Sequence, residues 1–253
     1  MCCIYVIGGE SLTINLPAKL TNNQFTYNEL SKLIEIMTSQ ETIAINFEKT
    51  VFIQPNILAL LSQSFYYAKQ SGKTIQCRHV TMRLARFLSQ YHFIKSITQE
   101  SQHYLTTSKF FKQERPLFEE MLISKLNYLK ESIQLYLIVR LGILFDLMSH
   151  SDAPLFVSGY CNLNQDWFCL TLASETLLFE TESDLEQALE RGEFKQTQVI
   201  EFSIFMKELL ALGGKIFIGT QSSLYQIHHQ IKFNVEGQFI GTFITLHIPI
   251  HLV

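Results

Sequence analysis

The sequence lacks a long uninterrupted apolar run. Its longest apolar stretches, such as residues 135–148, are interrupted, here by Arg140 and Asp146, whereas a membrane-spanning helix needs about 20 mostly apolar residues. The first residues, MCCIYVIGGESLTI, have no basic flank and few successive apolar side chains. They therefore fit neither a secretory signal nor a membrane anchor, and we expect a soluble, cytoplasmic protein.

Paired cysteine motifs are also missing. The five cysteines have no C-x-x-C spacing and an odd count, which argues against a disulfide framework or a zinc site and indicates a reducing compartment. Cys161 and Cys169 flank a candidate turn at residues 164–166 and could face each other across a hairpin. Two reduced thiols are the favoured interpretation, because free cysteines are commonly buried as small apolar side chains.

A general excess of positive charge is absent. The net charge of −3 and the isoelectric point near 6.2 argue against nucleic-acid binding. Arg83 and Arg86, which share a predicted helix face, belong to a local basic cluster that could meet an acidic partner or a phosphate, although a solvated face is the commoner explanation. The members of the cluster are Arg78, His79, Arg83, Arg86 and Lys95.

The histidines form no metal-ligand pattern. His228 and His229 would point to opposite faces of a predicted strand. His247 and His251, four apart on an extended segment, lie too far apart for one ion. We therefore predict no metal site.

Hydrophobic residues make up 47% of the chain, which suits two domains of about 100–150 residues each. Residues 98–116 are polar and lack a sustained period. We therefore predict a first domain over residues 1–97, a linker over 98–116 and a second domain over 117–253.

The first domain alternates strand and helix patterns. Pro55 begins the second helical run and Gly72 follows its end, the expected punctuation of a helix. This order favours a compact α/β unit. The predicted strands are residues 11–16, 42–47, 51–53 and 73–77, and the predicted helices are residues 27–37, 56–70 and 81–91.

The second domain begins with helices and ends with strands. Apolar spacing predicts one long or two consecutive helices over residues 117–150, an acidic helical segment over 182–191, and a helix that ends before Gly213. The predicted strands are residues 155–163, 167–172, 215–220, 226–235 and 241–252. We expect an α+β sandwich whose mixed, largely antiparallel sheet is covered by helices.

Residues 51–61 (VFIQPNILALL), with the elements that follow them, resemble a STAS domain of the anti-sigma-factor-antagonist type. The resemblance covers about residues 10–97 and implies a bacterial regulatory role. Partner-switching members of that family carry a phosphorylatable serine where this chain has Gln54, Pro55 and Asn56. We take these three positions, with Arg83 and Arg86, as candidate interaction residues.

The second half resembles the GHKL, or histidine-kinase-like, ATPase fold. Residues 139–151, 167–177 and 202–249 match it in order and spacing, and the most specific matches are residues 209–222 (LLALGGKIFIGTQS) and 241–249 (GTFITLHIP). Residues 182–192 also look like the short lid of proteins in which the two kinds of domain occur together.

The residues that hold ATP and Mg²⁺ in this family are replaced here. The pattern Glu-x3-Asn-x3-His, matched backwards from His150, puts Asp146 at the Asn position and Gly142 at the Glu position. Asp146 could still ligate Mg²⁺, but glycine cannot act as a general base.

The adenine and phosphate motifs are replaced as well. Asp-x-Gly-x-Gly falls on Ala173, Glu175 and Leu177, and an alanine leaves the adenine amine unpaired at a cost of about 1–3 kcal/mol. The phosphate-binding Gly-x-Gly falls near residues 199–202, where Glu201 repels anions. The retained glycines, Gly213, Gly214 and Gly241, suit turns and strand edges with or without a nucleotide.

These losses predict a non-catalytic regulatory protein that binds a protein partner, without cofactor, nucleic acid or membrane; a homo-oligomer is compatible with the sequence. The alternatives are a divergent ATP-dependent serine kinase or ATPase of the anti-sigma-factor type, which would use ATP and Mg²⁺ at Asp146, and a structural subunit of a larger complex. The predicted remnant nucleotide pocket consists of Asp146, His150, Ala173, Glu175, Gly241 and Thr242.

Overall fold

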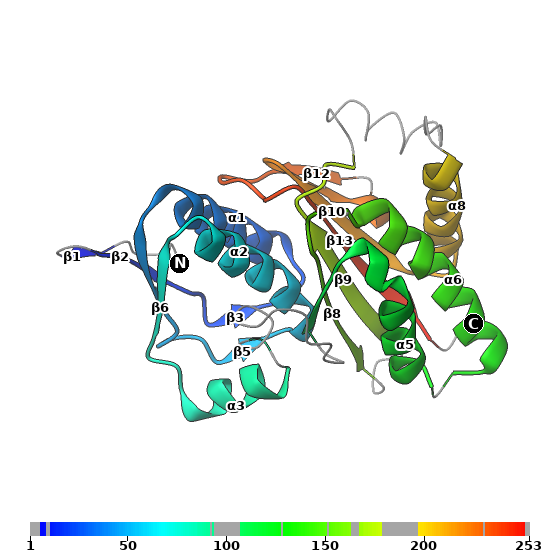
Figure 1. Cartoon of the computed structure of the whole chain (residues 1–253), viewed down its shortest axis with the longest axis horizontal. Coiled ribbons are helices and arrows are strands. Elements are labelled where there is room, and N and C mark those ends of the chain that lie inside the picture. The colour runs from blue at the N-terminus through cyan, green and yellow to red at the C-terminus, as the bar shows by residue number, and fades with distance from the viewer. Residues whose placement is uncertain are drawn as a thin grey trace.

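The computed structural model describes residues 6–8, 11–91, 93, 107–127, 129–150, 152–162, 167–178, 197–229 and 231–250. Within these residues the fold is mixed α/β, with three sheets and helices against two of them (Figure 1). No helix in this part of the chain is both long and apolar enough to cross a membrane.

The N-terminal unit is built on a four-stranded sheet with the order β1-β2-β4-β6. Its strands are β1 (Val6–Gly8), β2 (Ser11–Asn15), β4 (Thr42–Asn46) and β6 (Thr74–Arg78). β2, β4 and β6 are parallel, and β1 runs antiparallel to β2. A second, two-stranded parallel sheet joins β3 (Lys19–Leu20) to β5 (Phe52–Ile53).

Local sequence signals set the helices of this unit. Asn23 caps α1 (Gln24–Ser39), because its side chain accepts a hydrogen bond from the Thr26 amide at 2.9 Å. Pro55 opens the short 3-10 helix η1 (Pro55–Ile57), which continues into α2 (Leu58–Gln70). Thr81 caps α3 (Met82–Gln90) in the same way as Asn23 caps α1.

The C-terminal unit contains a seven-stranded antiparallel sheet with the order β12-β11-β10-β13-β9-β8-β7. The strands are β7 (Thr107–Phe110), β8 (Leu155–Asn162), β9 (Trp167–Ser174), β10 (Lys215–Thr220), β11 (Ser223–Gln226), β12 (Ile231–Asn234) and β13 (Thr242–Pro249). The other elements are η2 (Lys112–Glu114), α5 (Arg115–Lys125), α6 (Glu131–Met148), α8 (Thr197–Ala211) and η3 (Ile227–His229).

The sheet is covered on both faces. Side chains such as Leu172, Ile218 and Leu246 share a buried cluster with α5, α6 and α8, whereas their neighbours Ala173 and Phe217 share a second cluster with α1 and α2. Figure 1 shows the N-terminal unit on one side of the sheet and these three helices on the other. The sheet is therefore the common core of both units.

Aromatic side chains dominate the contact between α1, α2 and the sheet. The ring of Tyr27 on α1 stacks on Phe243 of β13 with centroids 5.0 Å apart, and it lies 5.7 Å from Phe217 of β10. Tyr66 on α2 lies 5.4 Å from Phe156 of β8. Pairs of this kind add about 0.5–1.5 kcal/mol beyond their buried area.

Two predicted segments differ from the structure. Residues 107–110, predicted as part of the linker, form the edge strand β7, so the linker prediction extends too far. The strand depends on its pairing with β8, which is distant in sequence, and Ser108, Lys109 and Phe110 are buried there. The predicted strand over residues 226–235 is interrupted by η3, which separates β11 from β12. The predicted acidic helix, residues 182–191, lies outside the described residues.

The pairing register settles the cysteine alternatives. Cys169 lies opposite Tyr160 and Cys161 lies opposite Phe168, so the two thiols project from opposite faces of the sheet. Both are free thiols, as the favoured interpretation predicts.

Gly241 combines a positive φ with a close approach to the backbone of a neighbouring strand, so a side chain there would be strained and would clash. Its φ is +61°, and a Cβ there would lie 2.2 Å from the Ser174 carbonyl oxygen. We expect Gly241→Ala to lower the free energy of unfolding by about 3 kcal/mol or more in urea titrations. Gly72→Ala is the matched control, because Gly72 also has positive φ but open space around it, and should cost only about 1–2 kcal/mol. Equal losses would contradict the close approach of β13 to β9.

Candidate functional site

A network of polar side chains lies inside the interface between the two units. The Tyr27 hydroxyl donates to Asn22 Oδ1 at 3.0 Å, and its oxygen lies 3.2 Å from Thr245 Oγ1. Asn56 Nδ2 donates to Asn22 Oδ1 at 2.7 Å and to Thr171 Oγ1 at 3.0 Å. The Thr171 and Thr245 hydroxyls are 2.8 Å apart on neighbouring strands. Because buried polar groups must pair, the network specifies how the units dock.

His247 on β13 belongs to the same network as a neutral ring. Asn22 Oδ1 accepts two hydrogen bonds, which leaves Asn22 Nδ2 as a donor to His247 Nε2 at 2.7 Å. Burial lowers the pKa of His247 from its ordinary value of 6.5 to about 4, with help from the charges of Lys215 and His228. Protonating Nε2 would place two donors face to face.

The candidate interaction residues at the start of α2 are covered by the sheet. The Gln54 side chain donates to the Tyr160 hydroxyl and accepts from the backbone amide of Asn22. The Pro55 carbonyl accepts from Ser158 Oγ at 2.7 Å, and Asn56 is fully buried. All three residues therefore serve the internal interface, and a second protein cannot reach Asn56 while the units stay docked.

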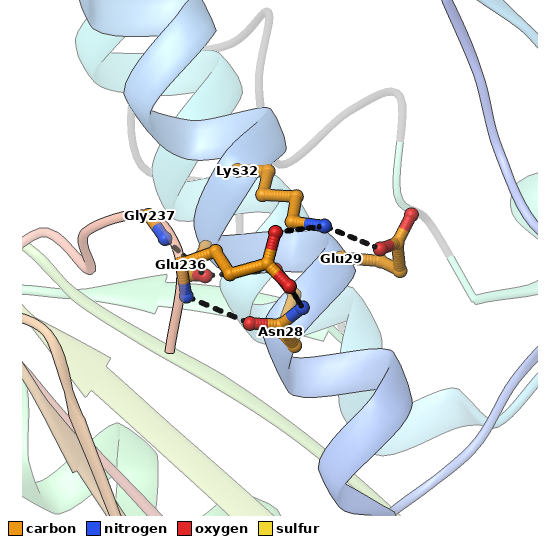
Figure 2. Close-up of polar contacts among 6 residues, drawn as sticks. Asn28, Glu29, Lys32, Glu236 and Gly237 are labelled. Carbon is orange, nitrogen blue, oxygen red and sulfur yellow. Dashed lines mark hydrogen bonds and ion pairs between the residues drawn. The ribbon is translucent and has the colours of Figure 1, made fainter. Parts of the chain in front are cut away.

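A polar clamp on α1 holds the loop between β12 and β13 (Figure 2). Asn28 forms two hydrogen bonds with Glu236, one to its amide at 2.7 Å and one to its carboxylate at 3.1 Å. Lys32 Nζ lies 2.7 Å from the Glu236 carboxylate and 3.1 Å from that of Glu29. Gly237 lies against the α1 backbone, and a Cβ there would be 2.4 Å from the Ser31 carbonyl oxygen. Only glycine allows this approach.

Asp146, the residue at the predicted Mg²⁺ position, is ion-paired with Arg115 of α5. The same guanidinium also pairs with Glu119 at 2.9 Å. A Cβ on Gly142, one turn earlier on α6, would lie 2.9 Å from Arg115 Nη2, so the absence of a glutamate side chain at position 142 makes room for Arg115. Burial raises the pKa of the Asp146 carboxyl, and the Arg115 charge opposes that rise.

Four of the other pocket residues come together at one end of β9 and β13. Thr242 lies opposite Ser174 and Phe243 lies opposite Ala173, and Gly241 packs on the backbone of Glu175. However, Ala173 belongs to the cluster that faces α1 and α2, whereas α6 with Asp146 covers the opposite face of the sheet. The six predicted residues therefore do not line one pocket. His150 is exposed beyond the end of α6.

The described residues do not fit Mg-ATP. Arg115 is ion-paired with the Asp146 carboxylate, and Ala173 supplies no acceptor for the adenine amine. Glu201 is exposed near the start of α8. The described part of the chain contains no group of three or more His, Cys, Asp or Glu residues that could hold a metal ion. The prediction that His228 and His229 lie on opposite strand faces is wrong, because both are in η3 with ring centroids 4.3 Å apart.

Arg83 and Arg86 are exposed on α3, whereas Leu84 and Leu88 on its other face are buried.

The interface network was not predicted from the sequence, although Thr171 and Thr245 gave a signal for it. Each is a polar residue at an inward strand position among apolar neighbours. A hydroxyl in such a place needs a buried partner.

A scan of the chain against protein-family models found no match, and a search of the curated proteins found no relative.

The neutral state of His247 makes stability depend on pH. Its pKa is about 4 in the folded chain and near 6.5 when unfolded, so between these values the unfolded chain binds more protons and stability falls as the pH falls. We expect this group to remove about 3 kcal/mol on acidification through that window. His247→Gln should flatten the dependence in urea titrations at pH 7 and pH 4.5, and His150→Gln, at an exposed histidine, should not. An unchanged slope in the His247 variant would contradict the buried neutral ring.

The α1 clamp predicts a specific effect at Gly237. Gly237→Ala should displace the loop from α1 and lower the free energy of unfolding by about 2 kcal/mol, the usual cost of an extra buried methyl group without room. Gln238→Ala is the control, because the side chain of the neighbouring Gln238 is exposed. It should leave the free energy of unfolding nearly unchanged. If both variants unfold at the same urea concentration, the loop does not rest on α1 as described.

Proposed function

We propose that this chain is a non-catalytic regulatory protein that binds another signalling protein. In this proposal the N-terminal unit is a STAS-like domain, and the C-terminal unit is a GHKL-like domain that no longer handles ATP. The observation that carries the proposal is the ion pair of Arg115 with Asp146 over Gly142. The guanidinium of Arg115 pairs with the Asp146 carboxylate, which Mg²⁺ would otherwise need as a ligand.

The second face of the sheet supports the same conclusion. An ATPase of this kind needs an accessible nucleotide pocket, and Ala173 contributes its side chain to a packed internal cluster instead. The Tyr27 hydroxyl pairs with Thr245 Oγ1, and Asn56 Nδ2 donates to Thr171 Oγ1, so these groups have partners inside the chain. No arrangement of nucleophile, base and open space is left among these residues, so binding by outer surfaces is the activity that the geometry favours.

Docking of the two units also directs where a partner binds. The start of α2, at which partner-switching relatives of the resembled family are modified, is buried by the chain's own sheet. A partner must therefore use the outer surface of the N-terminal unit or the outer faces of α5, α6 and α8.

A nucleotide titration tests the proposal. A ligand at 100 times its dissociation constant stabilises a protein by about 2.7 kcal/mol, so an ATP-binding chain would melt at a higher temperature in millimolar Mg-ATP. We expect no Mg-dependent shift by scanning fluorimetry and no release of phosphate. Mg²⁺ alone and ATP alone are the controls. A shift that is present in the native chain and lost in Asp146→Asn would establish the ATP-dependent enzyme instead.

A further inference from the structure

The carboxyl ends of the three parallel strands β2, β4 and β6 lie along one edge of the N-terminal unit. Asn15, Asn46 and Arg78, the last residues of these strands, are in register across the sheet. This edge of a parallel sheet is the one that commonly binds ligands. In Figure 1 it is the side on which β3, β5 and α3 lie.

Hydrogen bonds join the loops at this edge into one surface. The Phe47 amide donates to the Arg78 carbonyl at 2.9 Å, and the Val51 amide donates to the Ala18 carbonyl at 2.8 Å. The Thr50 hydroxyl donates to the Pro17 carbonyl at 3.1 Å. The segments that follow β2, β4 and β6 are therefore held side by side.

Positive charge is concentrated on this surface. Residues 16–20, 47–53 and 78–90 contain five lysines and arginines against one acid, Glu48, whereas the whole chain has a net charge of −3. Among the described residues, neither Arg83 nor Arg86 takes part in an ion pair. The five basic residues are Lys19, Lys49, Arg78, Arg83 and Arg86, and all are exposed.

Three large apolar side chains are exposed within the same segments. Met82 is 71% exposed, Val51 is 61% exposed and Phe52 is 45% exposed. Met82 and Arg86 are four residues apart on α3 and therefore share a helix face. Arginine, methionine and aromatic side chains are the types enriched at protein interfaces. We call the five basic and three apolar residues the basic edge.

We propose that the basic edge binds an acidic segment of a partner protein. Carboxylates of the segment would pair with Arg83, Arg86 and the neighbouring basic residues, and an apolar side chain of the segment would pack on Met82 and Phe52. Charge complementarity favours an acidic segment, because the edge is basic although the rest of the chain is acidic. A basic partner would be repelled by the edge. The proposal rests on the proposed function and names the chemistry of its partner.

The exposed apolar side chains favour a protein over a nucleic acid. Phosphate backbones are bound through positive charge, largely without apolar contact, whereas an acidic peptide with an apolar residue uses both components of the edge. Arg83 and Arg86 should supply most of the affinity, with Met82 as the apolar anchor.

Selection from a random peptide library displayed on phage, with the full chain as bait, tests the proposal. We expect enrichment of peptides rich in Asp and Glu that also contain a large apolar residue. Fluorescence anisotropy then measures the binding of the best peptide. Arg83→Glu with Arg86→Glu should weaken it at least about tenfold, Met82→Ala should weaken it about threefold, and raising the salt concentration should weaken it further.

Lys69→Glu with Lys207→Glu is the matched control, because it makes the same charge change at exposed sites on α2 and α8 and should leave binding within about twofold. Enrichment of peptides without acidic residues, equal binding by the Arg83/Arg86 variant, or tighter binding of duplex DNA or phosphatidylserine vesicles than of the peptide would overturn the assignment of the edge. The proposed function fails separately, by Mg-ATP stabilisation, whatever the peptides do.

Discussion

The fold depends on covering both faces of the seven-stranded sheet. Antiparallel sheets commonly leave one face to solvent and then alternate apolar with polar residues, but β9 and β13 are buried at nearly every position. Helices α5, α6 and α8 cover one face and α1 with α2 covers the other. Exposing Phe217 and Phe243 to water would cost about 2 kcal/mol each, so the N-terminal unit is part of the fold of the C-terminal unit.

The interface combines this apolar burial with polar specificity. Asn22 lies at the centre of the network, because its side-chain oxygen Oδ1 accepts from Tyr27 and Asn56 while its side-chain nitrogen Nδ2 donates to His247. Such a network stabilises one docking geometry, since any sliding leaves buried groups unpaired. The polar side chains at the start of α2 also form their hydrogen bonds within this interface. A partner therefore has the outer surfaces to bind, including the basic edge.

Much of the architecture could be predicted from the sequence. Pro55 and Gly72 bound the second helix, and the apolar run at residues 216–218 identifies the strand at residues 215–220, because these are local signals. The break at Ile227–His229 and the pairing of Thr107–Phe110 with β8 could not be predicted, because both depend on neighbours distant in sequence. The pairing of Arg115 with Asp146, and the face of the sheet on which Ala173 lies, could not be predicted for the same reason. The STAS and GHKL assignments stay predictions.

The most direct test of the docked arrangement is alkylation of the native chain, followed by mass spectrometry of each cysteine. Cys169 is a buried thiol opposite Tyr160, whose hydroxyl contacts Gln54 of the N-terminal unit, whereas Cys77 is exposed. Cys77 should react at once, and Cys169 only as the whole chain unfolds in urea. Modification of Cys169 at the rate of Cys77, in a chain that is still folded, would contradict the docked arrangement.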